Sequence, residues 1–532
     1  MKKRLIGVTM VCVMAAGAIA GCSQNSVKVQ IPSSTESATT TVNQVEGKTP
    51  KYVFLFIGDG MSYPQVQLTN YYLNASSNAS SGNAEEKPLT SSSQLTMMNF
   101  PVVGSAQTYD STSFAPDSAS TATSIATGQK TWSGSINVSE DFSIEYETIA
   151  EKLKKQKNYK VGIVSSVNIN HATPAAFYAH QASRNNYYEI GQELIESEFD
   201  YFAGGALKQP TGSDKNQKDL YELAKENGYK VVKTQEEAKK LTSKDGKVIV
   251  IEDKLADSDS LAYNIDLEKG EWALKDYVEK GIEVLDNEEG FFMMVEGGKI
   301  DWACHANDAG SAIFDTVALD QAVRKAVEFY NKHPEETLIL VTGDHETGGL
   351  TIGYAGTDYD TFLNNLSNQK ISYAKFDTDY VKSYKENKTE FTKVMKDIEK
   401  LFGLKAPTAN GTTVEIQKDS ADSHPESKQD GTLLLTDYEY GKLQEAYKTT
   451  LARTGEESTF SQEEYVEYGS YEPLTVTITH ILNNKSGINF ASYSHTGLPV
   501  GVFAKGEVAS QFEGYYDNTD IFKQLAKVTG VK

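Results

Sequence analysis

Cysteine is rare in this sequence, with three residues among 532, at Cys12, Cys22 and Cys304. Cys12 and Cys22 lie in the N-terminal segment discussed below, which leaves Cys304 alone in the body of the chain. A mature chain that lacks Cys12 and carries lipid on Cys22 can therefore form no intramolecular disulfide. A metal site with several thiolates is excluded as well. We interpret Cys304 as a packing residue, because on a helix it would be rotated by about 100° from its neighbour His305.

Positive charge is also scarce, since the chain has 51 Lys and Arg residues and 73 Asp and Glu residues, which gives a net charge of −22. This balance argues against nucleic acid as a partner, because clustered Lys and Arg are what binds a phosphate backbone. It favours a soluble, secreted surface. It does not exclude phosphate substrates, since bound divalent ions can reverse the local field. The length allows several domains or one large sheet with insertions, and a hydrophobic content of 39% is ample for a core.

A long apolar run that could form a permanent membrane span is missing at the N-terminus. Residues 5–20 are apolar and follow the basic Lys2-Lys3-Arg4, but they are too few and too rich in Ala and Gly. A positive segment followed by such a run is typical of a signal peptide, which we predict over residues 1–21. The next residues, 22–49, are rich in Ser, Thr, Asn and Gln, and we expect a flexible polar tether.

The sequence Ile19-Ala20-Gly21-Cys22 resembles a bacterial lipoprotein processing site. Cleavage there would make Cys22 the lipid-bearing first residue of the mature chain. An ordinary secretory cleavage beside an incidental cysteine is the alternative. We therefore expect an extracytoplasmic lipoprotein, anchored to the membrane at the cell surface or in the periplasm. The type of cell envelope and the retention of the anchor are not determined by these residues.

What the sequence does contain is a set of polar motifs beside apolar, strand-like runs. Carboxylates and imidazoles at the carboxyl ends of buried strands are where an open α/β sheet places its chemistry. The pairs of run and motif are KYVFLFI (51–57) with Gly58-Asp59-Gly60, FFMMV (291–295) with Glu296 and then Asp301 to His305, LILVT (338–342) with Gly343-Asp344-His345-Glu346, and LPVGVFA (498–504) preceded by Ser494-His495-Thr496-Gly497.

The spacing within these motifs predicts a metal site. Asp301 and His305 are four residues apart, so one helical turn places both on the same face. Asp344 and His345 are adjacent at a strand end. Oxygen and imidazole ligands suit Zn²⁺ in an open catalytic site and Mg²⁺ beside it. Ser118 near a helix start would face the positive end of the helix dipole, which favours a bound anion, although Asp117 and Ser118 are also preferred helix caps.

Six segments of the chain, in this order, resemble the alkaline phosphatase family. They are FIGDGM (56–61), PDSASTAT (116–123), HATPAAFYAHQASR (171–184), VEGGKIDWACH (295–305), VTGDHETGG (341–349) and SHTGLPVGVFAKG (494–506), and FEGYYDNTDIF (512–522) resembles the family's closing segment. The likeness covers residues 50–354 and 485–532, which we expect to form the catalytic core.

The resemblance implies two Zn²⁺ ions, a nearby Mg²⁺ ion and a serine nucleophile. Ser118 would attack phosphorus, Arg184 would clamp the phosphate and Asp117 would orient Arg184. Small-molecule phosphate monoesters are the implied substrates, and a homodimer is implied because the family is often dimeric. The implied ligands are, for the first zinc, Asp301, His305 and His495; for the second zinc, Asp59, Asp344, His345 and, during attack, Ser118; and for the third ion, Asp59, Glu296 and Thr173.

Two positions depart from the best-known bacterial pattern. His171 stands where that pattern has aspartate, and Trp302 stands where it has lysine. An imidazole is less suited than a carboxylate to organising the water shell of Mg²⁺. Trp302 replaces a cation near the phosphate by a flat aromatic wall. Both zinc sites stay complete, so these changes leave only the identity of the third metal open.

Strand and helix patterns alternate from residue 51 onward, which predicts an α/β fold with a mostly parallel central sheet and helices on both faces. Residues 355–484 break this pattern and are predicted to be an inserted cap or crown region with a helix over 389–401 and a polar loop over 408–431. The expected strands are 52–57, 102–107, 161–166, 248–251, 291–295, 338–342 and 499–504, and the expected helices of the core include 147–155, 187–197 and 313–332.

Three functions are compatible with these residues. We predict a phosphate monoester hydrolase, because Ser118 occurs together with Thr173 and Glu296 of the third-ion set. A phosphodiesterase or sulfatase of the same superfamily is the first alternative, since such relatives often use threonine or a modified residue as nucleophile. A non-catalytic lipoprotein that binds phosphate or metal is the second, although a binder needs neither a nucleophile nor a metal for the leaving group.

Overall fold

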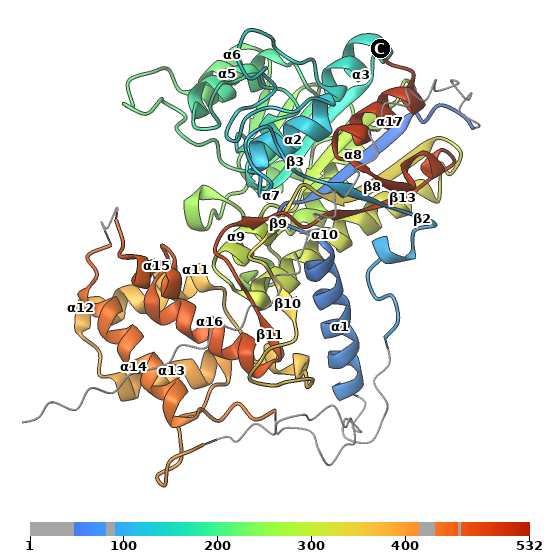
Figure 1. Cartoon of the computed structure of the whole chain (residues 1–532). Helices are drawn as coiled ribbons and strands as arrows, with labels where there is room; N and C mark the ends of the chain where they lie inside the picture. Colours follow the sequence, from blue (N-terminus) through green and yellow to red (C-terminus); the bar gives the residue numbers. More distant parts are fainter. Residues whose placement is uncertain (1–46, 81–90, 414–430, 456–458) are drawn as a thin grey trace, which may run out of the picture. The chain divides into compact units, whose positions relative to one another are not determined.

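The computed structural model of the protein describes residues 47–80, 91–413, 431–455 and 459–532 (Figure 1). The predicted signal peptide, the lipidation site Cys22 and residues 22–46 of the tether lie outside the described residues. Within the described ranges, no helix has both the length and the apolar character that crossing a membrane requires. Residues 45–532 form one compact unit.

A ten-stranded sheet runs through this unit, in the order β14-β2-β13-β8-β1-β7-β3-β4-β6-β5. Its neighbouring strands are parallel except where β13 pairs with β8 and β2. The predicted α/β class with a mostly parallel sheet is therefore confirmed. The strands of this sheet are β1 (Tyr52–Gly58), β2 (Val102–Gln107), β3 (Lys160–Asn168), β4 (Tyr201–Gly205), β5 (Lys230–Val232), β6 (Val248–Ile251), β7 (Phe291–Glu296), β8 (Thr337–Gly343), β13 (Val500–Lys505) and β14 (Gly514–Asp517).

The central strand β1 is buried on both faces, which is why it reads as an unbroken apolar run. Successive side chains of a strand point to opposite faces. Phe54 and Phe56 accordingly belong to one hydrophobic cluster, whereas Val53 and Leu55 belong to another. The sheet thus separates two cores, and its parallel strands end at a common edge.

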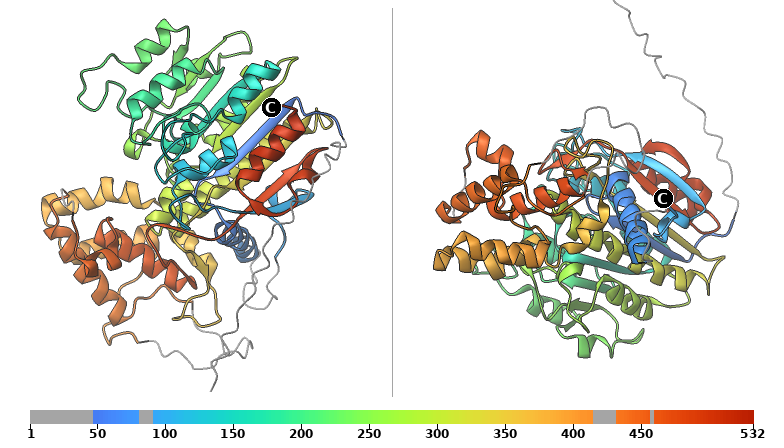
Figure 2. Two further views of the ribbon diagram at one scale, coloured as in Figure 1. Left: turned by 45° about the horizontal axis from the view of Figure 1, so that its top comes forward. Right: turned by 90° about the horizontal axis from the view of Figure 1, so that it is seen from below.

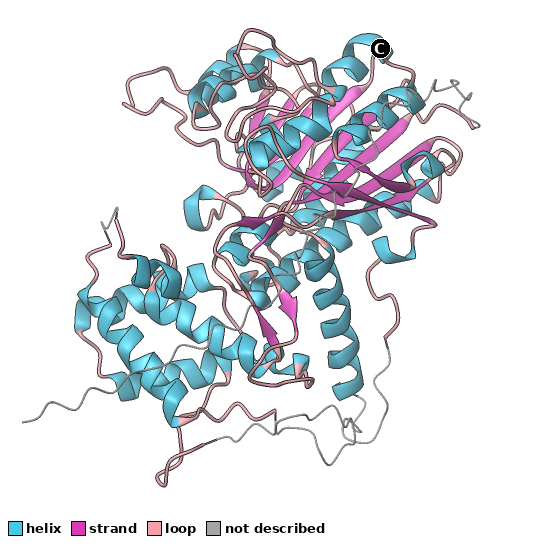
Figure 3. Ribbon diagram, viewed as in Figure 1, coloured by secondary structure: helices cyan, strands magenta, loops and turns pink. Residues whose placement is uncertain are grey.

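Helices cover both faces of the sheet (Figures 2 and 3). Helices α1 (Tyr63–Ser80), α8 (Leu274–Leu285), α9 (Lys299–His305) and α10 (Ala309–Tyr330) contribute to the cluster of Phe54. The opposite cluster is built by α2 (Ser118–Thr127), α3 (Ile149–Lys157), α4 (Ala172–Ala175), α5 (Tyr187–Glu196), α6 (Leu220–Glu226) and α17 (Thr519–Thr529). Apart from single turns of 3-10 helix, the remaining short elements described outside the predicted insert are α7 (Gln235–Ala238), β9 (Glu346–Thr347), β10 (Thr351–Ile352), β11 (Ile488–Asn489) and β12 (His495–Thr496).

The predicted insert, residues 355–484, is mostly helical where it is described, and its helices group together in orange in Figure 1. Phe376, Ile398 and Leu474 of these helices belong to the same hydrophobic cluster as Phe54 of the sheet. The insert therefore packs against the core, and the two share one continuous apolar interior. Whether it is a domain of its own stays a prediction. Its helices are α11 (Tyr373–Phe376), α12 (Lys382–Asn387), α13 (Phe391–Phe402), α14 (Asp437–Ala452), α15 (Gln462–Tyr468) and α16 (Pro473–Lys485).

Candidate active site

Three carboxylates lie together at the edge where β1, β7 and β8 end. Ile57 of β1 pairs in register with Glu296 of β7, and Gly58 pairs with Gly343 of β8. Asp59 and Asp344 directly follow those glycines. The parallel register therefore brings Asp59, Glu296 and Asp344 to one place, although they are far apart in the sequence.

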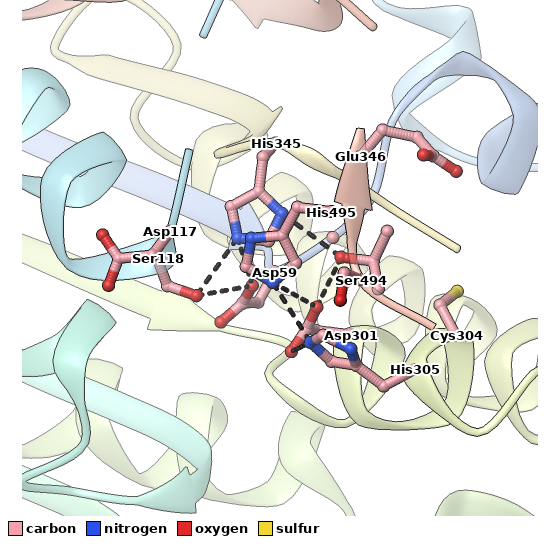
Figure 4. A network of polar contacts seen from close by, with 12 residues as sticks. Asp59, Asp117, Ser118, Asp301, Cys304, His305, His345, Glu346, Ser494 and His495 are labelled. Atoms are coloured by element: carbon pink, nitrogen blue, oxygen red, sulfur yellow. Dashed lines mark hydrogen bonds and ion pairs between the residues drawn. The ribbon is translucent and has the colours of Figure 1, made fainter. Parts of the chain in front are cut away.

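Asp301, His305 and His495 form the first group of potential metal ligands (Figure 4). Helix α9 places Asp301 and His305 one turn apart, with 3.3 Å between Asp301 Oδ2 and His305 Nε2. His495, from β12, contributes Nε2 at 3.1 Å from His305 Nε2 and 3.6 Å from Asp301 Oδ1. The i, i+4 spacing of the α9 pair is as predicted.

Backbone carbonyl groups fix the orientation of both imidazoles. His305 Nδ1 lies 2.5 Å from the carbonyl oxygen of Tyr493, and His495 Nδ1 lies 2.5 Å from that of Pro116. Donating Nδ1–H to these carbonyl groups leaves a lone pair on each Nε2 of the neutral rings. These two lone pairs, on nitrogens 3.1 Å apart, can both be donated to one metal ion. This group therefore fits a metal ion.

Asp59, Asp344 and His345 form the second predicted ligand set. His345 Nε2 lies 3.3 Å from Asp59 Oδ1 and 3.3 Å from Asp344 Oδ2. Asp59, Asp301 and His345 also satisfy the geometry of a ligand group, so Asp301 lies between the two sets. The turn after β1, which brings Asp59 to this set, requires glycine at position 60. The backbone of Gly60 has a φ of +71°, and a Cβ there would come within 2.8 Å of Thr347 Oγ1.

Ser118 begins helix α2, and its hydroxyl points to the second ligand set (Figure 4). Ser118 Oγ lies 3.1 Å from His345 Nε2 and 3.4 Å from Asp59 Oδ1. The capping interpretation applies to Asp117, whose Oδ1 accepts a hydrogen bond from the Ser120 backbone at 3.1 Å. The cap leaves the Ser118 hydroxyl available to the site, at the positive end of the helix.

Arg184 reaches the same place from a loop. Its Nη1 donates to Asp117 Oδ2 at 2.8 Å, so one carboxylate both caps α2 and holds the guanidinium. Because of the Asp117 charge, the pKa of Arg184 is raised despite its burial. The arginine lines the same cavity as Ser118. Serine hydroxyl, helix N-terminus and guanidinium thus face a common space that suits a phosphate.

Glu296 and Thr173 lie on the far side of Asp59. Thr173 Oγ1 donates to Asp59 Oδ2 at 3.2 Å, and Ser165 donates to Glu296 Oε2. The other oxygen, Glu296 Oε1, is buried without a hydrogen-bond partner, as is Nδ1 of His171. An orphaned carboxylate oxygen beside Asp59 fits a third cation. Of the two unusual positions, His171 packs its ring against Trp302 with 5.9 Å between centroids.

Four acidic side chains share this buried region. Asp59, Glu296, Asp301 and Asp344 are each at most 5% exposed. Burial and the neighbouring carboxylates raise the pKa of Asp59 and Asp344, and burial raises that of Glu296 to about 7. For Asp301 burial alone would raise the pKa, but His305, His495 and His345 together outweigh burial and lower the pKa. Such a concentration of negative charge calls for bound cations.

Several residues of the site were not predicted. Thr347 Oγ1 donates to Asp301 Oδ1 at 2.5 Å, and Thr121 Oγ1 donates to Asp344 Oδ2 at 3.2 Å. Each threonine donates a hydrogen bond to a potential metal ligand and is not a ligand itself. Its residue type therefore did not indicate a role in the site, although it lies inside one of the motifs. Cys304 lies in the core, where Gln65 Nε2 is 3.9 Å from its sulfur, and it is the one cysteine among the described residues.

Comparison with known proteins decides the family. Residues 50–531 match the model of the family described as alkaline phosphatase. The chain belongs to the alkaline phosphatase family. Alkaline phosphatase 4 of Bacillus subtilis (strain 168) is 28% identical over 539 residues, covering 99% of this chain and 97% of that protein. The family predicted from the motifs is thus confirmed, and with it an enzyme of the metal-dependent alkaline phosphatase type.

Solved alkaline phosphatase structures share the fold. The cold-active enzyme from a psychrophilic Shewanella species is 24% identical with a TM-score of 0.69, covering 90% of this chain and 99% of that one. A variant of the enzyme from the Antarctic bacterium TAB5, with a histidine replaced by glutamate, has a TM-score of 0.57 and 24% identity, covering 92% of this chain and 100% of that one. That variant holds magnesium in a site called M3.

Proposed function

We propose that this protein hydrolyses phosphate monoesters through a phosphoserine at Ser118. The observation that carries the proposal is the position of the Ser118 hydroxyl, at a helix N-terminus, 3.1 Å from His345 Nε2 and across one cavity from Arg184. A nucleophile, a metal-ligand set and a phosphate clamp are thereby within reach of one phosphoryl group. Serine is a poor nucleophile unless its hydroxyl is ionised, and a ligand set beside it meets that need.

The donor atoms fit two Zn²⁺ ions and one Mg²⁺ ion. Asp301, His305 and His495 would hold the first zinc, and the facing Nε2 lone pairs described above support it. Asp59, Asp344 and His345 would hold the second. Asp59, Glu296 and Thr173, with the unpartnered Glu296 Oε1, would hold the third ion. When bound, these cations would favour the ionised serine and neutralise the charge of the phosphoryl oxygens.

The side chains then act in two displacements. Ser118 Oγ attacks phosphorus in line, the bond from phosphorus to the ester oxygen breaks, and the departing oxygen takes up a proton to leave as an alcohol. Water next attacks the phosphoserine, and inorganic phosphate and the free serine hydroxyl are formed. Throughout, the fork of Arg184 donates to two phosphoryl oxygens, while Asp117 holds that fork in place.

The proposal extends to where the protein works. We propose an exported lipoprotein, attached through Cys22 and a polar tether, whose catalytic core is formed by residues 50–354 and 485–532. Residues 355–484 would be an inserted crown, and the protein would be a homodimer. Sequence patterns and family resemblance support these points. Mass spectrometry of the mature N-terminus and light scattering would test the anchor and the dimer.

Turnover of a monoester and of its diester counterpart tests the reaction. We expect the full-length protein, loaded with Zn²⁺ and Mg²⁺, to hydrolyse 4-nitrophenyl phosphate with a kcat/KM at least about 100-fold above that for bis(4-nitrophenyl) phosphate, because the clamp and ligands surround the non-bridging oxygens. Preference for the diester would replace the monoesterase by the phosphodiesterase alternative. Phosphate binding without any turnover would instead indicate a binding protein.

Replacing Arg184 tests the phosphate clamp. Arg184→Ala should weaken competitive inhibition by inorganic phosphate by about 10- to 100-fold, because two charge-assisted hydrogen bonds are lost. Arg184→Lys should give an intermediate loss, since an ammonium keeps the charge but not the fork. Arg324→Ala is the matched control, because Arg324 pairs with Asp320 on α10, outside the cavity. Unchanged phosphate inhibition in Arg184→Ala would remove Arg184 from the clamp.

A further inference from the structure

The cavity that contains Ser118 and Arg184 has walls that the chemistry above does not use. Its volume is about 390 Å³, and besides the metal ligands it is lined by Trp302 and by two tyrosines, Tyr373 and Tyr471. Both tyrosines come from residues 355–484, outside every motif of the family. Three aromatic side chains at the mouth of a polar site need an explanation beyond phosphoryl transfer.

The two tyrosines are held in fixed positions. The Tyr373 ring packs against Tyr263 with 5.6 Å between centroids, and the two hydroxyl groups lie 3.1 Å apart. The backbone N–H of Tyr373 donates to Asp308 Oδ2 at 2.9 Å. Tyr471 meets the Tyr373 ring edge-on, at 5.7 Å and 85°, and its carbonyl group accepts from Arg453. A wall built this way is formed before any ligand binds.

Trp302 is fixed from the opposite direction. Lys299 Nζ lies 4.6 Å from the centre of the Trp302 ring and 4.1 Å from that of Tyr263. This lysine is fully buried and pairs with Asp257 Oδ1 at 2.6 Å. A cation between two aromatic faces and a carboxylate holds the indole in one orientation. The indole and the tyrosines therefore form a rigid aromatic surface.

This surface lies where a leaving group would be. Ser118 is beside Asp59 and His345, so an in-line attack directs the ester oxygen away from these two residues, toward the group of Asp301, His305 and His495. Trp302 and Tyr471 line the same cavity as Asp301, His305 and His495. Both aromatic side chains thus flank the exit side of the phosphoryl group.

The charges of the cavity limit what can be accommodated there. Among its lining residues Arg184 is the one Lys or Arg, and the in-line geometry assigns it to the phosphate. The other charged lining side chains, Asp257 and Asp301, are acidic. Asp257 is paired with Lys299, and Asp301 lies beside His305. The wall therefore offers no free cation to a leaving group that carries a carboxylate or a second phosphate, whereas a flat uncharged ring would stack on its aromatic side chains.

We propose that Tyr471, Tyr373 and Trp302 form a leaving-group pocket that selects phosphate monoesters of flat, uncharged aromatic alcohols. The proposal rests on the monoesterase function proposed above. Residues 355–484, through the two tyrosines, thereby contribute to the specificity of the reaction without taking part in its chemistry.

A matched pair of substrates tests the pocket. Benzyl phosphate and cyclohexylmethyl phosphate differ in whether their six-membered ring is flat and aromatic. We expect the wild-type protein to prefer the benzyl ester by about three- to tenfold in kcat/KM, the size of an aromatic stacking contribution. Tyr471→Ala should abolish most of this preference, whereas Tyr471→Phe should keep it. Tyr438→Ala, which alters an exposed tyrosine of α14 outside the cavity, should change neither substrate.

Inhibition by inorganic phosphate separates the possible outcomes. If Tyr471 contacts the leaving group, Tyr471→Ala leaves phosphate inhibition unchanged, because phosphate has no leaving group. A variant that loses both substrates and phosphate inhibition equally would show a merely structural role and overturn the pocket. Equal turnover of both esters by the wild type would overturn it as well, with the monoesterase function intact. Turnover of neither ester would overturn the monoesterase function and the pocket together.

Discussion

Ser118→Ala is expected to lower kcat for a phosphate monoester by about 10⁴-fold or more, because no other hydroxyl can take the place of the attacking oxygen. Thr121 is the nearest candidate in the same helix, but its hydroxyl is already donated to Asp344. The variant should fold normally, since the helix cap is made by Asp117 and the Ser118 hydroxyl has no role in it. Steady-state turnover and far-UV circular dichroism measure the two effects.

A control in the same helix makes this result specific. Ser124→Ala removes another buried hydroxyl of α2, one that only donates to the Ser120 carbonyl group, and should leave kcat within about twofold. Acid quenching with radiolabelled monoester should trap label on wild-type protein and none on Ser118→Ala. Turnover of the alanine variant near the wild-type rate would exclude the phosphoserine route.

Removal of metal by a chelator is expected to abolish turnover and to lower the melting temperature by roughly 10 °C or more. The loss of stability follows because Asp59, Glu296 and Asp344 then lie buried without a cation, and such an uncompensated set costs several kcal/mol. Zn²⁺ and Mg²⁺ together should restore both properties. Melting curves of the chelated and the reloaded protein provide the measurement, and a chelated protein with unchanged melting temperature would contradict the cation requirement.

The chelated protein should also become less stable as the pH rises. In the folded, metal-free state the pKa of Glu296 is raised to about 7, above its ordinary value of 4.5. The folded state then binds the proton more tightly than the unfolded state, so stability is fully present below pH 4.5 and is lost as the pH rises toward 7. In Glu296→Gln, which cannot ionise, the metal-free protein should show a weaker decline. An equal decline in the variant would assign the effect to other groups.

Most of the sheet could be predicted from the sequence because its central strands are buried on both faces. Strands β2 and β6 have the predicted bounds, and β1 and β8 exceed them by one or two residues. Strand β4 was not predicted, since YFAGG ends in two glycines and has no β-branched residue. Strand β5 is only three residues long. Such strands are defined by their neighbours in the sheet rather than by their own composition.

The candidate ligands that the structure brings together could be selected from the sequence where they follow a strand, as Asp59 and Asp344 do, or share one helical turn, as Asp301 and His305 do. Their role as ligands stays a prediction. The supporting contacts could not be selected in this way. His305 and His495 are oriented by the carbonyl groups of Tyr493 and Pro116, which any residue could supply. Tyr471 reaches the cavity from a region without a recognisable motif. Long-range contacts of this kind depend on how the whole chain packs, and the sequence of a short segment does not determine them.

His495, in strand β12, lies next to Pro116, although the two are 379 residues apart in the sequence. During synthesis the chain therefore carries the pair from α9 long before it can offer His495, the third residue of the same potential ligand group. Contacts between such distant positions form late in folding, after the loop between them has closed. If this group holds a metal ion as proposed, firm uptake of that ion would require completion of the C-terminal segment.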